Sequence, residues 1–209
     1  MYTHSNQIFT GGAPAAGADA AIIAIHGRGA NAQDIMRLAR EFKLDNAAIY
    51  APQATNNSWY PYSFLASVEQ NEPALSSALE LIDETVKQAI ANGFSAENIY
   101  FTGFSQGACL SLEYVARNAK QYGGVAAFTG GLIGEQLDVN NYEGDFNNTP
   151  IFIATGNPDP HVPLKRVEES VEVLKGLGAD VTLKIYPGRP HTVAYDELKL
   201  ANELIFKAK

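Results

Sequence analysis

The sequence predicts an α/β fold with a mostly parallel central sheet and helices on both faces of that sheet. Short apolar runs such as residues 20–25 recur along the chain, and such a run is typical of a strand buried on both faces. Most runs are followed by a segment whose apolar residues recur at helical spacing. This alternation favours a parallel sheet. Because there is no internal repeat and no break in composition, we expect a single domain over residues 1–209.

The composition excludes several classes of protein. A chain of 209 residues with 46% hydrophobic side chains can bury a sizeable core. Its formal net charge of −8 repels phosphate backbones, so we expect no nucleic-acid partner. The one cysteine, Cys109, allows neither an intramolecular disulfide nor a cysteine-based zinc site.

The sequence also bears on location. It has no signal-peptide pattern, and no apolar run approaches the roughly 20 residues that span a bilayer. We therefore expect a cytoplasmic protein without a membrane span. The sequence leaves the oligomeric state open, a homodimer included.

The elements of the first half of the chain follow from local patterns. Ile35, Leu38 and Phe42 share one side of a helix, and Pro73 suits the first turn of another. The expected order is at most an edge strand in the first twenty residues, a strand over 20–25, a helix over 31–43, a strand over 47–51, a polar and aromatic loop over 53–71, and a helix from Pro73 to Asn92.

The second half continues the alternation up to the end of the chain. A Gly-rich loop follows the expected strand over 125–128, and glycines end the helix that begins at Leu164. The expected order is a strand over 99–102, a helix from 107 to about Asn118, strands over 125–128 and 151–155, a helix from Leu164 to Gly176 or Gly178, a strand over 181–186, and a helix over 193–207.

Residues 103–107 read Gly-Phe-Ser-Gln-Gly and match the pattern G-x-S-x-G. The bare pattern is short, but an apolar strand runs into it and a helical segment runs out of it. That context is typical of a sharp turn that projects a serine above a sheet, with flanking glycines because a Cβ would clash. We therefore expect Ser105 to be a nucleophile, although an ordinary strand–turn–helix with an exposed serine remains the alternative.

A serine nucleophile needs a base and an acid, expected in the chain order Ser, acid, His. His191 lies on the loop after the expected strand over 181–186, where a general base can stand above the sheet. Asp159 follows the expected strand over 151–155 and can orient that imidazole. The alternative for Asp159 is a turn-forming aspartate between prolines.

The other histidines have simpler interpretations. His161 is a rival base, but we expect it at the rim of the pocket or at the start of a helix. His4 lies in the weakly patterned N-terminal segment and is expected to be solvated. His26, His161, His191 and Asp159 lack recognised metal-ligand spacing, so we expect no metal.

An oxyanion hole needs two N–H donors. The Gln106 N–H lies at the expected helix N-terminus, where the dipole favours an anion. The loop His26-Gly27-Arg28-Gly29-Ala30 can turn the Arg28 N–H inward, and it lacks the lysine and the spacing of a phosphate-binding loop.

Four segments together resemble the phospholipase/carboxylesterase family of α/β-hydrolases, which includes acyl-protein thioesterases and small bacterial carboxylesterases. They read HGRGA, GFSQGA, GNPDPHVP and PGRPH, and the resemblance covers nearly the whole chain from residue 20 onward. It implies the α/β-hydrolase fold and the same triad and oxyanion residues. The chain departs from the family's pattern at Arg28, at Thr155, at Arg189 and in the stretch from Ser58 to Phe64.

The aromatic stretch that contains Trp59, Tyr60 and Phe64 is the expected substrate contact, with His161 at the rim. The alternative is that these aromatic residues cap the core beneath a long loop. Together these features predict a cofactor-free serine hydrolase of small-molecule carboxylic esters, with thioesters and lysophospholipids as further candidates. A catalytically silent binding protein on the same scaffold is the alternative.

Overall fold

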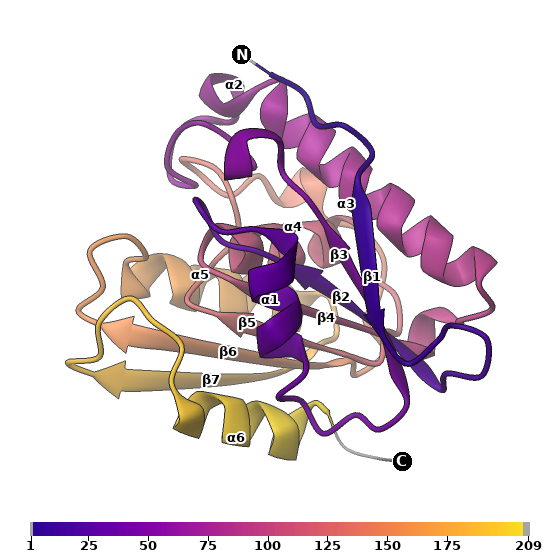
Figure 1. The fold of residues 1–209 in the computed structure, drawn as a ribbon. Coiled ribbons are helices and arrows are strands. Elements are labelled where there is room, and N and C mark those ends of the chain that lie inside the picture. The colour runs from indigo at the N-terminus through magenta and orange to yellow at the C-terminus, as the bar shows by residue number, and fades with distance from the viewer. Residues whose placement is uncertain (1, 207–209) are drawn as a thin grey trace.

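The computed structural model describes residues 2–206, and seven strands of that stretch form one sheet (Figure 1). The strands are β1 (Ile8–Gly12), β2 (Ala20–Ile25), β3 (Ala47–Pro52), β4 (Ile99–Phe104), β5 (Gly124–Phe128), β6 (Pro150–Asn157) and β7 (Asp180–Pro187). Their order is β1-β3-β2-β4-β5-β6-β7, and only the pairing of β1 with β3 is antiparallel. The predicted mostly parallel sheet is therefore confirmed, and the first twenty residues do contain an edge strand.

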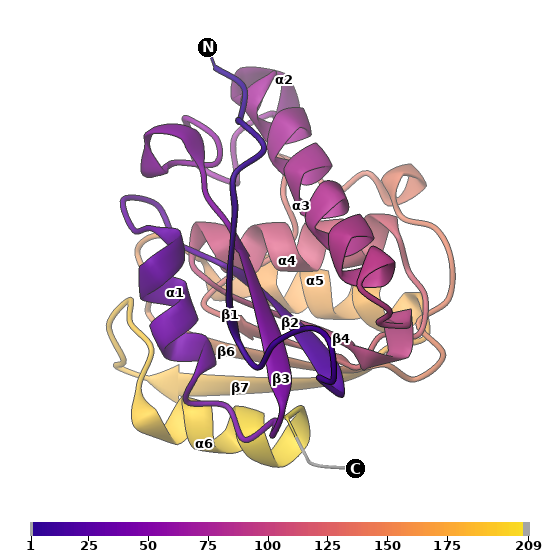
Figure 2. The ribbon, with the colours of Figure 1, turned by 45° about the vertical axis from the view of Figure 1, so that its right-hand side comes forward.

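Helices cover both faces of this sheet (Figures 1 and 2). They are α1 (Ala32–Ala39), α2 (Val68–Asn71), α3 (Ala74–Ala91), α4 (Gln106–Arg117), α5 (Leu164–Gly176) and α6 (Tyr195–Leu204). The apolar sides of α3, α4 and α5 share one buried cluster with one face of the sheet. Those of α1 and α6 share a second cluster with the other face. Among the described helices, none combines the length and the apolar character that spanning a bilayer requires.

Two helix boundaries differ from the sequence prediction, and the short helix α2 forms at the end of the segment 53–71, which the sequence predicts as a loop. The helix expected over 31–43 ends at Ala39, although Phe42 remains buried because its ring stacks on Phe206 with centroids 3.9 Å apart. Burial rather than helical geometry explains its place in the apolar pattern. The last helix ends at Leu204, and residue 207 of its expected range lies outside the described residues.

The strand order creates a crevice at one edge of the sheet. From β2 the chain first adds β3 on one side and then β4 on the other, so the connections leaving β2 and β4 part in opposite directions. In open parallel sheets, ligands bind beyond the carboxyl ends of strands at such a reversal. The loops over residues 26–30 and 104–106 meet at this point.

Candidate active site

Ser105 lies at the sharp turn between β4 and α4. Its backbone has φ 54° and ψ −117°, a conformation that side-chain-bearing residues rarely adopt. The Ser105 N–H donates to the carbonyl oxygen of Phe128 at 2.9 Å, and the Ser105 carbonyl accepts from the N–H of Cys109 at 3.0 Å. The predicted strand–turn–helix is confirmed, and these bonds hold the serine in its strained position.

The two glycines of the motif allow three chain segments to approach closely. A Cβ on Gly107 would overlap the carbonyl oxygens of Ile25 and His26, at the end of β2. A Cβ on Gly103 would overlap the backbone of Gly107 itself. No side chain fits between these backbones, so α4 can begin directly against the neighbouring strand only with glycine at both positions.

Replacing Gly107 by alanine should lower the free energy of unfolding by about 3 kcal/mol, because the new methyl group meets rigid backbone. Urea unfolding measures this loss. Gly176→Ala, at the end of α5, is the matched control, because a Cβ added there would have no atom within 4 Å. It should change stability by less than about 1 kcal/mol. Equal stability of the two variants would contradict the packing argument.

A chain of two hydrogen bonds connects Ser105, His191 and Asp159. Nε2 of His191 lies 2.8 Å from Oγ of Ser105, and Nδ1 of His191 lies 2.8 Å from Oδ2 of Asp159. An ionised Asp159 accepts from the Nδ1–H, which leaves Nε2 free to accept the Ser105 hydroxyl proton. The three residues come from the carboxyl ends of β4, β6 and β7.

The Asp159 side chain is buried and well supplied with donors. Its Oδ1 accepts the backbone N–H groups of His161 at 2.8 Å and Val162 at 3.0 Å. Burial by itself raises the pKa of the Asp159 carboxyl, but hydrogen bonds from His191, His161 and Val162 outweigh it, and the pKa lies below its usual value. The group is therefore held as a carboxylate.

The loop that carries His191 is fixed on both sides. The Arg189 guanidinium pairs with both carboxylate oxygens of Asp196 on α6, at 2.6 and 2.7 Å, and lies over the Tyr186 ring. A Cβ on Gly156, in β6, would overlap the Arg189 carbonyl, so this glycine lets the loop pack against the strand. Gly156 begins the segment GNPDPHVP, but nothing in the sequence indicates this contact with the loop of His191.

The two predicted oxyanion donors, the backbone N–H groups of Arg28 and Gln106, belong to segments next to Ser105. The Gln106 N–H belongs to the first turn of α4, where intrahelical acceptors are lacking. The Arg28 N–H lies in the loop after β2, and the Cβ position of the preceding Gly27 is 3.6 Å from the Ser105 Cβ. Within the described residues neither N–H has a protein acceptor. Both are therefore available to an oxygen of a bound substrate.

Two histidines anchor the loop over residues 54–60 rather than entering the site. His26 is fully buried; its Nδ1–H donates to the Gly27 carbonyl and its Nε2 accepts the Ala54 N–H at 3.1 Å. His4 accepts the Thr55 N–H at 3.0 Å and donates to the Trp59 carbonyl at 2.9 Å. The expectation of a solvated His4 is wrong, because the N-terminal segment packs over this loop.

The same loop buries Trp59. Its indole is fully buried and donates to the His26 carbonyl at 2.8 Å, and its ring packs on that of His26. The Gln106 side chain accepts the Trp59 N–H and donates to the Tyr60 carbonyl, both at 2.9 Å. Trp59 therefore caps the core, the alternative that the sequence left open, and lies outside the cavity described below.

These anchors make stability depend on pH. Burial lowers the pKa of His4 and of His26 below the ordinary value of about 6.5, and a proton added to either ring would remove an acceptor. The unfolded chain therefore binds more protons as the pH falls through about 6.5, so this stability is present above that pH and is lost below it. When the pH is lowered from about 7.5 to about 5, we expect the urea concentration at the unfolding midpoint to decrease. The decrease should be smaller in His4→Gln. Identical slopes in both proteins would contradict this.

Ser105 opens into a cavity of about 600 Å³. Of the predicted substrate contacts, Tyr60, Phe64 and His161 line it, and Trp59 does not. The lining also includes residues that the sequence did not predict as substrate contacts, among them Leu65, Pro160 and Val162. The His161 ring stands edge-on to that of His191, with centroids 5.0 Å apart, and makes no hydrogen bond to Ser105 among the described contacts.

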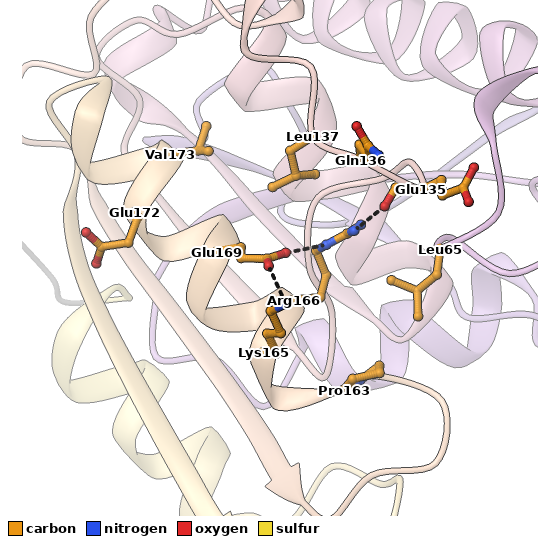
Figure 3. Close-up of a pocket in the computed structure, with 10 residues that line it drawn as sticks. All are labelled: Leu65, Glu135, Gln136, Leu137, Pro163, Lys165, Arg166, Glu169, Glu172 and Val173. Carbon is orange, nitrogen blue, oxygen red and sulfur yellow. Dashed lines mark hydrogen bonds and ion pairs between the residues drawn. The ribbon is translucent and has the colours of Figure 1, made fainter.

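A second hollow of about 680 Å³ lies beside the first, and Leu65 lines both (Figure 3). Its apolar wall includes Leu137 and Val173, and its charged side carries Arg166, which pairs with Glu169. No serine, cysteine or histidine is among the described residues that line it. It is therefore a surface hollow without a nucleophile.

The described residues offer no metal site and no reactive thiol. No group of three or more His, Cys, Asp or Glu side chains within residues 2–206 could hold a metal ion. Cys109 is buried one turn after Ser105, and burial raises the pKa of its thiol to about 12. Among the described residues that line the cavity, Ser105 is the one whose hydroxyl bonds a histidine ring nitrogen.

The chain is similar to known proteins over almost all of its length. A family model described as phospholipase/carboxylesterase matches residues 7–208. The crystal structure of a phospholipase/carboxylesterase from Dyadobacter fermentans is 60% identical, with a TM-score of 0.98 and 99% of each chain covered.

Two curated relatives are more distant. A protein of Arabidopsis thaliana, described as a SOBER1-like probable carboxylesterase, is 30% identical over 145 residues, which are 68% of this chain and 55% of the relative. An acyl-protein thioesterase 1 of Gibberella zeae is 35% identical over 115 residues, 54% of this chain and 49% of the relative. The chain thus spans about half the length of these two relatives.

Proposed function

Because the chain belongs to the phospholipase/carboxylesterase family of α/β-hydrolases, we propose that it is a serine hydrolase of carboxylic esters. The observation that carries the proposal is the pair of 2.8 Å hydrogen bonds from His191 to Ser105 and to Asp159. A nucleophile, a base and an orienting carboxylate in that order are what acyl transfer requires.

The proposed mechanism uses only groups of this chain. Oγ of Ser105 attacks the ester carbonyl while Nε2 of His191 takes its proton, and Asp159 holds the imidazole and stabilises the imidazolium. The N–H groups of Arg28 and Gln106 donate to the oxyanion. His191 returns the proton to the leaving alcohol, and water then cleaves the acyl-enzyme with His191 again as base. The mechanism needs no metal and no cofactor.

Thioesters are a second substrate class that this mechanism accommodates, since a thiolate leaves more readily than an alkoxide. The similarity to a fungal acyl-protein thioesterase favours including them, although that match covers 54% of this chain. A catalytically silent binding protein is the remaining alternative. Binding alone does not require the side chains of Ser105, His191 and Asp159 to be hydrogen-bonded in series, as they are here.

Hydrolysis of 4-nitrophenyl acetate, butyrate and octanoate by the purified protein tests the proposal. We expect turnover that is lost in Ser105→Ala, with the trend across chain length reporting the depth of the cavity. An alkyl fluorophosphonate should label Ser105 covalently. Absence of both turnover and labelling would favour the binding protein; labelling without turnover would point to a narrow substrate range.

A further inference from the structure

The side chain of Arg28 stands at the wall of the cavity that Ser105 opens into. Arg28 is exposed, and its backbone N–H is the proposed oxyanion donor. Because one residue supplies both groups, a single side chain connects the guanidinium to the N–H that is proposed to hold the reacting carbonyl. The charge is therefore close to the substrate without touching the bond that breaks.

Three hydrogen bonds hold the guanidinium in place. Nη1 donates to the Pro61 carbonyl at 2.8 Å and to the Ser58 hydroxyl at 3.2 Å, and Nη2 donates to the Tyr62 carbonyl at 2.6 Å. All three acceptors are neutral. The group is thus ordered before any ligand arrives, which reduces the entropy cost of binding to it.

Among the described residues, no carboxylate neutralises the charge of Arg28. Arg37, Arg117, Arg166 and Arg189 pair with carboxylates, whereas within residues 2–206 no carboxylate lies within 4.0 Å of Arg28. A guanidinium has five N–H donors, and the three bonds above leave two of them without a protein partner. Two donors are the number that a carboxylate engages in a bidentate pair.

The surroundings of Ser105 differ in charge on their two sides. The described residues that line its cavity include Arg28 but no aspartate or glutamate. Beyond Leu65, the second hollow carries Glu135, Glu169 and Glu172 against Lys165 and Arg166 (Figure 3). An anionic substituent is therefore attracted to the Arg28 wall and disfavoured on the Leu65 side, in a chain whose overall charge is −8.

We propose that Arg28 binds a carboxylate carried by the ester substrate, so that the preferred substrates are esters with an anionic substituent a few bonds from the scissile carbonyl. This rests on the proposed ester hydrolysis. The carboxylate can belong to the acyl part, as in a monoester of a dicarboxylic acid, or to the leaving alcohol. The competing explanation is that the Arg28 guanidinium only stabilises the loop over residues 58–62 through these hydrogen bonds.

Three substrates and three variants test the proposal. The substrates are the 4-nitrophenyl monoester of glutaric acid (acyl carboxylate), 4-carboxyphenyl pentanoate (leaving-group carboxylate) and 4-nitrophenyl pentanoate (neutral). The variants are Arg28→Gln, Arg28→Lys and, as matched control, Arg40→Gln. Arg40 is also exposed and pairs with no carboxylate among the described residues, but it lies at the end of α1, away from the cavity.

Arg28→Gln should lower kcat/KM for a carboxylate ester by about 10- to 100-fold more than for the neutral ester, mainly through KM. The carboxylate ester whose kcat/KM decreases more shows whether the acyl part or the leaving alcohol of the preferred substrate carries the anion. Arg28→Lys should keep part of the preference, and Arg40→Gln all of it. An equal decrease in kcat/KM for all three esters would overturn the proposal. Arg28 would then only stabilise the loop over residues 58–62, and the proposed hydrolase function would stand.

A binding measurement keeps the inference testable even if no ester is hydrolysed, the result that would refute the proposed function instead. In Ser105→Ala, isothermal titration should detect monomethyl glutarate binding that Arg28→Gln weakens by at least about 10-fold. Methyl pentanoate should bind equally to both proteins. Equal binding of monomethyl glutarate with and without Arg28 would overturn the inference.

Discussion

Ser105→Ala is expected to lower kcat for ester hydrolysis by about 10⁴- to 10⁶-fold, the scale seen when a nucleophile that acts with a base is removed. The alanine leaves His191 and Asp159 in place but provides no oxygen to form the acyl-enzyme. The residual rate should come from the two N–H donors and from substrate positioning alone. Stopped assays with 4-nitrophenyl butyrate measure the loss.

The fold should survive this change, because the bonds that hold residue 105 are made by its backbone. The Ser105→Ala protein should show a far-ultraviolet circular dichroism spectrum like that of the wild type. Ser111→Ala is a matched control: it removes a serine hydroxyl from α4, the helix that follows Ser105, and this hydroxyl donates to the Gly107 carbonyl and does not line the cavity. A folded Ser105→Ala protein with more than about a tenth of the wild-type rate would exclude Ser105 as the nucleophile.

His191→Ala is expected to lower kcat by about 10⁴- to 10⁶-fold, since it removes the only imidazole that bonds Oγ of Ser105 among the described residues. His161→Ala tests the rival base under the same conditions. It should change kcat by no more than about 10-fold, because the His161 contact with Asp159 is made by its backbone N–H, which alanine retains.

Comparing the two variants separates a general base from a histidine that only lines the cavity. Added imidazole should partly restore the rate of His191→Ala if the space left by the ring admits it, and should not affect His161→Ala. A loss in His161→Ala as large as that in His191→Ala would show that the assignment of the base is wrong.

The sequence was sufficient for the order of the seven strands and of every helix except α2, and for the triad candidates. Apolar runs such as residues 20–25 predict buried strands because both of their faces must be covered, and the parallel sheet confirms it. Strand ends then limit where a base and an acid can lie. His191 and Asp159 follow neighbouring strands, β7 and β6; their side chains bond each other, and that of His191 also bonds Ser105.

The segment over residues 53–71, which ends in α2, could not be predicted in the same way. Its aromatic residues have no periodicity, so the sequence left open whether they contact substrate or cap the core. The structure divides them: Trp59 is held in the core by the His26 carbonyl and the Gln106 side chain, while Tyr60 and Phe64 line the cavity. These contacts join segments that are far apart in the chain.

The sequence by itself determined the α/β class, the turn at Ser105 and the order in which a base and an acid follow it, because periodicity and glycine geometry act over a few neighbouring residues. Only the tertiary structure decided that His4 is an anchor, that Trp59 is core, and that Arg28 lines the cavity of Ser105 without a carboxylate partner among the described residues. Whether a polar side chain is solvated, structural or presented to a ligand depends on what packs around it. That is a property of distant segments brought together by the sheet, and no local pattern contains it.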